Sequence, residues 1–318
     1  MASLFVTGCA GFIGSHLCKK LISDGYTVIG IDNFDPFYPR YLKENNLRSI
    51  ISNPSFTFIE GDITLTDWYQ KVSDSKPDAV LHLAGKAGVR PSIEHPQDYI
   101  DANVTGTKNI LEFMRIYKIN KLVFASSSSV YGNAATFPVK EDADLSRPIS
   151  PYAVSKIAAE LLNYTYHTIH HLSIINLRFF TVYGPGQRPD LAINKFITAL
   201  KNNQPVTLFG NGSTGRDYTY VDDTVTGIIL ALNYLNANSS VYEIINLGNN
   251  NPVLLKDLLQ EVASAVGKKA EIIYAPEQPG DVKLTFADIS KAKQLLHYAP
   301  KTSIAEGIKK YVEWMEEN

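Results

Sequence analysis

The sequence predicts an α/β protein with a Rossmann-like doubly wound parallel sheet and a smaller mixed α/β lobe. Short apolar runs alternate with helical patterns through the first half of the 318-residue chain, an order typical of βαβ units and parallel sheets. A glycine-rich turn at 7–14 follows the first apolar run, where this fold has its first tight turn. A segment rich in Gly, Pro and Asn at 183–216 then breaks the alternation and marks a second lobe.

Each element is expected from its local pattern. Apolar runs predict strands at 4–6, 26–31, 56–60, 79–83, 121–126 and 172–177. Helical patterns lie at 14–21, 99–117 and 151–169, and the last has Ser150 as a suitable N-cap before Pro151. We also expect a helix near 191–201, a strand at 242–247 that returns to the main sheet, a strand at 271–274 and two terminal helices.

Composition limits the classes of partner. The net charge is −2, from 30 basic and 32 acidic residues, so we expect neither nucleic acid nor a membrane as a partner. No apolar stretch approaches the ~20 residues of a transmembrane helix, and the first residues lack a signal-peptide pattern, so we expect a cytoplasmic protein. Cys9 and Cys18 have no zinc-ligand spacing. The histidines at 167, 170 and 171 could share a helix face, but no carboxylate completes a site with them, so we expect no metal.

The glycine-rich turn predicts a dinucleotide site. Gly8, Gly11 and Gly14 let the backbone approach a pyrophosphate at a helix N-terminus, although their spacing is G-x-x-G-x-x-G. Asp32 ends the second strand, 18 residues after Gly14, and an acidic residue there favours NAD over NADP. Asp62 is expected to bond the adenine amino group.

The predicted NAD-binding residues are Gly8, Gly11, Phe12, Ile13, Gly14, Asp32, Asn33, Asp62, Ile63, Leu83, Ala84 and Lys156. We accordingly expect a NAD-binding Rossmann domain at 1–180, to which 218–248 returns. The substrate-binding lobe is expected at 181–217 and 249–318.

Three residues form a candidate catalytic set. Tyr152 and Lys156 are four residues apart on a predicted helix, so they share one face. The lysine charge favours the phenolate, which is suited to remove a hydroxyl proton. Taken alone, this pair is more often an ordinary surface pair. Ser127 strengthens the case because it follows the strand before that helix, at the edge where parallel sheets bind ligands.

The order of these motifs resembles the extended short-chain dehydrogenase/reductases of the NAD-dependent epimerase/dehydratase family. T-G-x-x-G-x-x-G, S-S-x-x-Y-G and Y-x-x-x-K all occur, and the similarity spans nearly the whole chain. The resemblance implies roles for Ser127, Tyr152 and Lys156 in proton and hydride transfer. The acid pair of the nucleotide-sugar 4,6-dehydratases would fall at Ser128 and Ser129. Both are serine, and this departure favours an epimerase over a dehydratase.

The substrate residues are expected from the same resemblance. Thr181 stands where many relatives have an asparagine, and Arg216 lies in a segment similar to the family's R-D-Y/F-x-x-V-x-D, where it implies phosphate binding. Three stretches, around 31–43, 87–92 and 188–196, resemble UDP-glucuronate 4-epimerases. A fourth stretch, 278–282 (QPGDV), adds weight to this resemblance and contributes Asp281 as a candidate substrate residue. Arg188 is hypothesised to bind a carboxylate, with Thr181 or nearby serines assisting. The alternative is that Arg188 only orders its own loop. The predicted substrate residues are Ser127, Ser128, Tyr152, Thr181, Arg188, Arg216 and Asp281.

The sequence therefore predicts a UDP-sugar 4-epimerase that inverts carbon 4 through a transient 4-keto sugar with tightly bound NAD. UDP-glucuronate and UDP-galacturonate are the expected pair, and UDP-glucose or UDP-N-acetylglucosamine is the alternative. A net NAD-dependent sugar-nucleotide reductase and a non-catalytic NAD(H)-binding module also stay open. The resemblance implies a homodimer through the helices at 99–117 and 151–169, whose apolar positions are otherwise explained by core packing.

Overall fold

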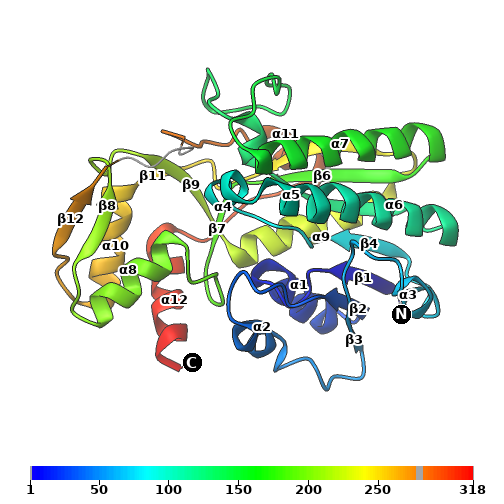
Figure 1. The fold of residues 1–318 in the computed structure, drawn as a ribbon, viewed down its shortest axis with the longest axis horizontal. Coiled ribbons are helices and arrows are strands. Elements are labelled where there is room, and N and C mark those ends of the chain that lie inside the picture. Colours follow the sequence, from blue (N-terminus) through cyan, green and yellow to red (C-terminus); the bar gives the residue numbers. More distant parts are fainter. Residues whose placement is uncertain (1, 277–281, 318) are drawn as a thin grey trace.

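A seven-stranded parallel sheet forms the larger part of the molecule, which is described from a computed structural model over residues 2–276 and 282–317 (Figure 1). The strands are β1 (Ser3–Thr7), β2 (Thr27–Asp32), β3 (Phe56–Glu60), β4 (Ala79–His82), β5 (Lys121–Ser127), β6 (Ser173–Phe179) and β10 (Tyr242–Leu247). Their order is β10-β6-β5-β4-β1-β2-β3, and every neighbouring pair is parallel. This order confirms the Rossmann-like fold, and 242–247 does return to the main sheet, beside β6.

Helices cover both faces of this sheet. They are α1 (Phe12–Ser23), α2 (Arg40–Leu47), α3 (Tyr69–Ser73), α4 (Val89–Glu94), α5 (Pro96–Tyr99), α6 (Gly106–Tyr117), α7 (Pro151–His170) and α9 (Val221–Ala237). Side chains alternate across each strand: Phe5 packs in the core under α6 and α7, whereas Leu4 and Val6 pack in the core under α1 and α9. The sheet is therefore buried on both sides, as its continuous apolar strands require.

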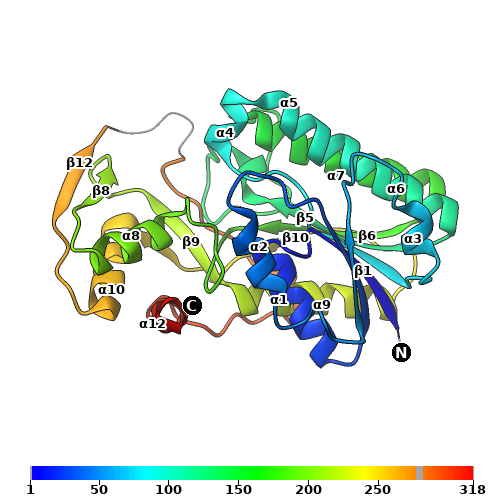
Figure 2. The same cartoon turned by 60° about the horizontal axis from the view of Figure 1, so that its bottom comes forward.

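The smaller lobe lies at the carboxyl ends of the parallel strands (Figure 2). Its elements are β7 (Thr181–Tyr183), α8 (Ala192–Lys201), β8 (Val206–Phe209), β9 (Gly215–Tyr220), β11 (Pro252–Leu254), α10 (Leu255–Val266), β12 (Ile272–Ala275) and α12 (Ile304–Glu317). The helix α11 (Ser290–Leu296) instead packs against α9 and β10 of the larger part. β11, β9 and β7 form one small sheet and β12 and β8 another. The exact division of the chain between the two lobes stays a prediction.

The helix expected at 99–117 has an interruption. A π-helical turn, η1 (Ile100–Thr105), separates α5 from α6. The helical periodicity of the sequence does not indicate this insertion, because a π-turn keeps the residues helical while it shifts which side chains share a face. By contrast, the start of α7 is as expected, since Ser150 Oγ accepts from Ala153 N at 3.1 Å.

A buried ion pair joins α7 to the sheet. Arg178 on β6 donates through Nη2 to Glu160 Oε2 at 2.7 Å and through Nε to Oε1 at 3.0 Å. Their side chains are only 2% and 4% exposed. Ser126 donates to the same carboxylate, and Tyr131 OH accepts from Arg178 Nη1 at 2.9 Å. Both charges are thus fully hydrogen-bonded, which is the condition for an ion pair to be tolerated in a core.

Among the described residues, no helix combines the length and the apolar character needed to cross a membrane.

Removing one partner of the Glu160–Arg178 ion pair should destabilise the fold. Glu160→Gln leaves Arg178 as an unmatched buried charge, and we expect the free energy of unfolding to fall by about 3–5 kcal/mol in denaturant titrations. The double variant Glu160→Leu/Arg178→Met should lose less than Glu160→Gln alone, because it leaves no buried charge. A loss below about 1 kcal/mol for Glu160→Gln would contradict this account of the pair.

Candidate active site

A cavity of about 1230 Å³ lies between the carboxyl edge of the main sheet and the smaller lobe. It is lined by the predicted residues Gly8, Gly11, Phe12, Ile13, Gly14, Asp32, Asn33, Asp62, Ile63, Leu83, Ala84, Ser127, Ser128, Tyr152, Lys156, Thr181, Arg188 and Arg216. Asp281 and Gln278 lie outside the described residues. The fold thus brings the expected cofactor, catalytic and sugar-nucleotide residues to one continuous space, although their individual roles stay predictions.

The glycine-rich turn follows β1 and is fixed by close backbone contacts. Gly8 has φ of +71°, and a Cβ there would lie 2.8 Å from the backbone N of Ala84. A Cβ at Gly14 would lie 2.0 Å from the carbonyl oxygen of Gly8. A larger residue at position 8 would therefore clash with the backbone that follows β4, and one at position 14 would push α1 away from the turn.

The N-terminus of α1 fits a dinucleotide pyrophosphate. Its N-cap is Gly11, no side chain accepts from the first-turn N–H groups, and the first turn holds no acidic residue. These N–H donors and the positive end of the helix dipole face the cavity beside Gly11 and Phe12, which is the arrangement that binds phosphate groups.

Asp32 presents a buried carboxylate at the end of β2. Phe34 N donates to Oδ1 at 2.8 Å and Ala10 N donates to Oδ2 at 3.1 Å. Burial raises the pKa of Asp32, and the charge of Lys43 and the two backbone donors oppose that rise. Each oxygen keeps a second lone pair for a ribose hydroxyl, and an anion here disfavours a ribose phosphate.

Asn33 and Asp62 form the next part of the cavity wall. Asn33 Nδ2 donates to Asp62 Oδ2 at 2.9 Å, and Thr64 N donates to Asp62 Oδ1 at 2.8 Å. This fixed carboxylate is suited to accept from an amino group, as expected for adenine.

The three candidate catalytic residues meet at the carboxyl end of β5. Ser127 ends the strand, and Tyr152 and Lys156 lie one turn apart on α7, which packs beside it. Lys156 donates to the carbonyl oxygen of Ala125 at 2.8 Å and lies 4.9 Å from the ring centroid of Phe124. All three side chains are buried, yet they line the cavity, so a bound substrate would reach them in a site largely shielded from water.

Burial tunes the charges of this set. It raises the pKa of Tyr152, and the Ser127 hydrogen bond and the charge of Arg188 oppose the rise. Burial lowers the pKa of Lys156 to about 8, against the opposing charge of Glu160. At pH 7 the lysine is therefore mainly cationic. A further positive charge in the cavity, such as an oxidised nicotinamide, would favour the phenolate.

A chain of buried hydrogen bonds connects the ends of β1 and β4. Thr7 Oγ1 accepts from the backbone N–H groups of residues 83 and 84 at 3.1 and 3.0 Å, so its own hydrogen is free for His82 Nδ1 at 2.7 Å. His82 Nε2 then donates to Thr107 Oγ1 at 3.1 Å, and Thr107 donates to Asn103 O at 2.6 Å. Burial lowers the pKa of His82 to about 3, so the ring stays neutral and keeps this single tautomer.

The side chain of Asn103, in the π-turn η1, continues this connection to the catalytic helix. Its Oδ1 accepts from Lys86 N at 2.8 Å and its Nδ2 donates to Lys86 O at 3.0 Å and to Ser155 Oγ at 2.8 Å. Ser155 donates to Tyr152 O at 2.8 Å. A Cβ at Gly85 would lie 2.6 Å from Asn103 Oδ1, which explains the glycine at the centre of this loop.

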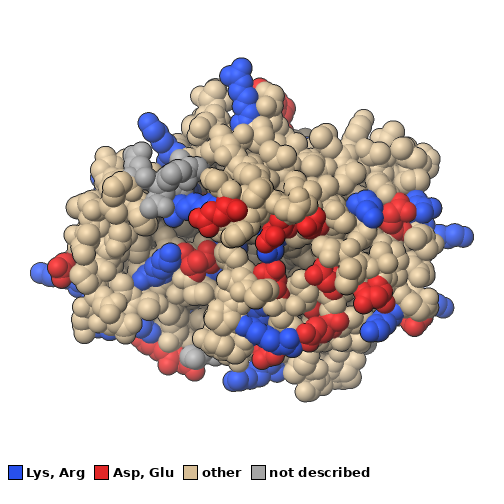
Figure 3. Space-filling view, viewed as in Figure 1, with Lys and Arg blue, Asp and Glu red and all other residues tan. Residues whose placement is uncertain are grey.

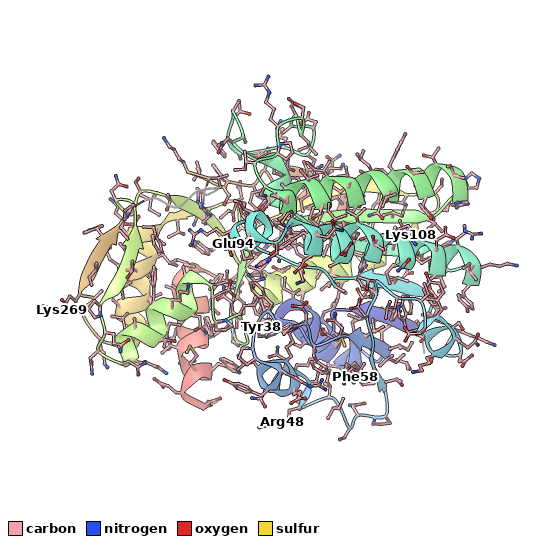
Figure 4. All side chains as sticks on the ribbon, in the orientation of Figure 1. Tyr38, Arg48, Phe58, Glu94, Lys108 and Lys269 are labelled. Carbon is pink, nitrogen blue, oxygen red and sulfur yellow. The ribbon has the colours of Figure 1, made fainter. Side chains whose placement is uncertain are left out.

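Arg188 crosses the cavity from the smaller lobe. It donates to Asp190 through Nε at 3.0 Å and Nη2 at 2.9 Å, and to Ala87 O through Nη1 at 2.9 Å. Its guanidinium lies 4.8 Å from the ring centroid of Phe37. The nearby Tyr38 lies near the centre of the molecule in Figure 4, beside α2. Arg188 thus orders its own loop in this structure, and a substrate carboxylate would have to compete with Asp190.

Several neutral hydroxyls also line the cavity. Ser128 begins a 3₁₀ turn, η2 (Ser128–Tyr131), and Ser129 N donates to Ser127 Oγ at 3.1 Å. Thr181 begins β7 and also lines the cavity. These groups donate or accept hydrogen bonds but supply no strong acid.

Arg216 and Asp217 point to opposite sides of β9. Arg216 lines the cavity and donates to Gly215 O at 2.8 Å. Asp217 is buried and accepts from the backbone N–H groups of 249–250 at 2.7 and 3.1 Å and of Ala287 at 3.0 Å. The R-D motif therefore combines a cavity-lining cation with a carboxylate that holds the smaller lobe together. On the face in Figure 3, charges of both signs are interspersed around the central hollow.

Comparisons with known proteins assign the family. A family model described as GDP-mannose 4,6 dehydratase matches residues 5–311. The chain belongs to this family. A UDP-glucuronate 4-epimerase of Thermodesulfobacterium geofontis is 43% identical over 320 residues, covering 100% of this chain and 97% of that protein.

Solved structures agree with this assignment. The UDP-glucuronic acid 4-epimerase of Bacillus cereus, in complex with UDP-glucuronic acid and NAD, matches with a TM-score of 0.93 and 39% identity, covering 99% of each chain. The UDP-glucose 4-epimerase of Thermotoga maritima, with UDP-glucose, matches with a TM-score of 0.90 and 32% identity, again over 99% of each chain. The resemblance identified from the sequence motifs is thereby confirmed.

Several residues that shape the site carry no recognisable motif. His82 and Asn103 act through hydrogen bonds between segments far apart in sequence, so no local pattern predicts them. Arg178 did offer a signal, because a charge within the apolar run 172–180 must find a buried partner. Glu160, four residues after Lys156 on the same helix face, is that partner.

The pKa of Lys156 gives a test of the catalytic set. The lysine loses its charge as pH rises through about 8, and a neutral amine no longer favours the phenolate of Tyr152. We expect kcat/KM to fall over this range in a pH–rate profile. Lys156→Met should be far less active and should lack this alkaline limb. A wild-type kcat/KM that keeps rising to about pH 10, the ordinary range of lysine, would contradict the assignment.

Proposed function

We propose that the protein is a NAD-dependent UDP-sugar 4-epimerase that interconverts UDP-glucuronate and UDP-galacturonate. The observation that carries the proposal is that buried Ser127, Tyr152 and Lys156 line one cavity, which reaches from the glycine-rich turn to Arg216. One end of this cavity fits a dinucleotide and the other a nucleotide sugar. The likeness to UDP-glucuronate 4-epimerases over the full chain supports the choice of substrate.

The chain's own residues supply acid–base chemistry. Tyr152 takes the proton of the 4-hydroxyl as that carbon is oxidised, and the Ser127 hydroxyl donates a hydrogen bond to the same sugar oxygen. When bound, NAD supplies the acceptor and later the donor of hydride. The resulting 4-keto sugar rotates in the cavity and presents its opposite face. Tyr152 then returns the proton, and the configuration at carbon 4 is inverted. General-base help of this kind contributes typically about 10²–10⁴-fold in rate.

Epimerisation is favoured over the dehydration named in the family description. Elimination of water requires an acid beside the leaving hydroxyl. The η2 turn places Ser128 and Ser129 on the cavity wall, and neither hydroxyl is acidic enough for that task.

The carboxylate of the sugar is proposed to bind between Arg188 and the hydroxyls of Ser127, Ser128 and Thr181. Arg188 already has a carboxylate partner in Asp190, so the substrate would share or displace that contact. The runner-up substrates are UDP-glucose and UDP-N-acetylglucosamine, and the likeness to the Thermotoga maritima enzyme supports the first.

We also propose a cytoplasmic homodimer. Exposed apolar side chains gather on α6 and α7, namely Ile116, Val154, Leu161, Tyr164 and Ile169. The two helices contact each other along one face of the molecule, and pairing with a second copy would form a four-helix bundle.

The reaction itself is tested without added cofactor. Purified protein with UDP-glucuronate should form UDP-galacturonate with no lasting absorbance change at the NADH band, whereas a net reductase would consume added NADH. Tyr152→Phe should retain bound NAD but lose at least about 10²-fold in turnover. A wild-type protein that binds NAD yet turns over no UDP-sugar would instead support a non-catalytic NAD(H)-binding module.

The proposed role of Arg188 is tested against that of Asp190. Arg188→Ala should raise KM for UDP-glucuronate at least about tenfold more than KM for UDP-glucose. Only UDP-glucuronate has a carboxylate, which would lose its guanidinium partner in this variant. Asp190→Ala is the matched control, since it disrupts the same loop contact but leaves the guanidinium in place. If both variants raise KM equally for both substrates, the proposed role is wrong and Arg188 only orders the loop.

A further inference from the structure

Tyr99, the last residue of α5, packs its ring against the ring of Tyr152. The two ring centroids lie 5.9 Å apart and the ring planes meet at 70°, which is the edge-to-face geometry that aromatic pairs favour. Tyr99 is 2% exposed and Tyr152 is 8% exposed, and both line the cavity. The ring of Tyr99 therefore borders the space that is open to the phenol of Tyr152.

The π-turn η1 begins directly after Tyr99, which is its N-cap residue. Such a turn closes through i→i+5 hydrogen bonds, so it is wider than an α-helical turn, and it occurs frequently at functional sites. Tyr99 and Asn103, four residues apart, both reach the catalytic helix α7. The first contacts Tyr152, and the second donates through Nδ2 to Ser155 Oγ at 2.8 Å. The wide turn thus brings two buried side chains against the beginning of α7.

The hydroxyl of Tyr99 holds the other end of the ring. It donates to Ala87 O at 3.4 Å, which is a long hydrogen bond. The same carbonyl oxygen accepts from Arg188 Nη1 at 2.9 Å, and it has lone pairs for both donors. Burial raises the pKa of Tyr99 to about 12, and the charge of Arg188 opposes that rise. Tyr99 therefore keeps its proton over the pH range in which Lys156 titrates, and it acts as a donor, not as a second base.

We propose that Tyr99 is a positioning residue for the general base, because its ring holds the phenol of Tyr152 in the orientation that reaches the 4-hydroxyl of the sugar. The backbone of α7 fixes the Cα of Tyr152 but leaves its side-chain torsions to be set by packing. A base has to lie within hydrogen-bond reach of the proton that it removes, and a small misplacement lowers the rate steeply. This inference rests on the proposed function, in which Tyr152 is the base.

The test measures kcat of the purified holoenzyme. Tyr99→Leu removes the ring but keeps an apolar side chain. We expect kcat for UDP-glucuronate to fall at least about tenfold, with KM and bound NAD within about twofold of wild type, because the loss is confined to the transition state. With UDP-glucuronate deuterated at carbon 4, the isotope effect on kcat should equal or exceed that of the wild type, since the step that moves this hydrogen has become slower.

The conservative variant Tyr99→Phe keeps the ring and loses only the long hydrogen bond to Ala87 O. Its kcat should stay within about threefold of wild type, as for the loss of one weak hydrogen bond. A kcat for Tyr99→Phe as low as that of Tyr99→Leu would overturn the proposal, because the ring would then not be the group that matters. If Tyr99→Leu does not fold, Tyr99→Met fills more of the same volume and takes its place, with the same expected fall in kcat.

Phe113→Leu provides the matched control. Phe113 lies on α6, is fully buried and packs edge to face with Phe5, at a centroid distance of 5.7 Å, but it is not among the described residues that line the cavity. This variant should lower the free energy of unfolding and leave kcat within about twofold of wild type at a temperature where it is folded. Equal falls in kcat for Phe113→Leu and Tyr99→Leu would overturn the proposal, as would a kcat of Tyr99→Leu close to that of the wild type.

Two further outcomes separate this inference from the proposed function. A lower kcat in Tyr99→Leu that comes with a matching loss of bound NAD or a matching rise in KM would overturn the positioning role, because the ring would then support the cavity as a whole. A wild-type protein that turns over no UDP-sugar would overturn the proposed function, and this inference with it. That result is distinct from an active wild type whose kcat is unaffected by Tyr99→Leu.

Discussion

The hydrogen bonds through His82 hold together the three segments from which the site is built. They join the end of β1 to the end of β4 and both to the π-turn η1. The chain departs in opposite directions after β1 and β4, so the cavity opens between them. Because burial keeps His82 neutral, these contacts do not depend on physiological pH. The glycine-rich turn and the catalytic helix α7 then have a fixed separation.

Several charged side chains are buried around the site, and the carboxylates among them accept hydrogen bonds from identified donors. Asp32 has two backbone donors, and Glu160 has Arg178 and Ser126. Lys156 is the exception, because it donates to the neutral carbonyl oxygen of Ala125. Burial lowers its pKa to about 8, and the charge of Glu160 opposes that shift. The fold therefore stabilises the carboxylates by hydrogen bonds, whereas the charge of Lys156 has no ion-pair partner among the described residues and changes more readily with its surroundings.

Much of this architecture is predictable from sequence, because strand and helix patterns and the turn at 7–14 are local. The prediction of a cap at Ser150 is confirmed for the same reason. The π-turn at 100–105 is not predictable, since nothing in the helical pattern indicates the extra residue. The carboxylate hypothesis for Arg188 missed Asp190, only two residues away, because loop conformation decides whether such neighbours pair.

The central claim is that hydride leaves and returns at carbon 4 of one substrate molecule within a closed site. Proton NMR of the purified protein with UDP-glucuronate deuterated at carbon 4, without added NAD, tests this most directly. UDP-galacturonate that retains deuterium at carbon 4 is the expected result, because the same hydrogen returns to the opposite face. Product in which solvent hydrogen replaces that deuterium would contradict hydride transfer, and the absence of any epimer would contradict the choice of substrate.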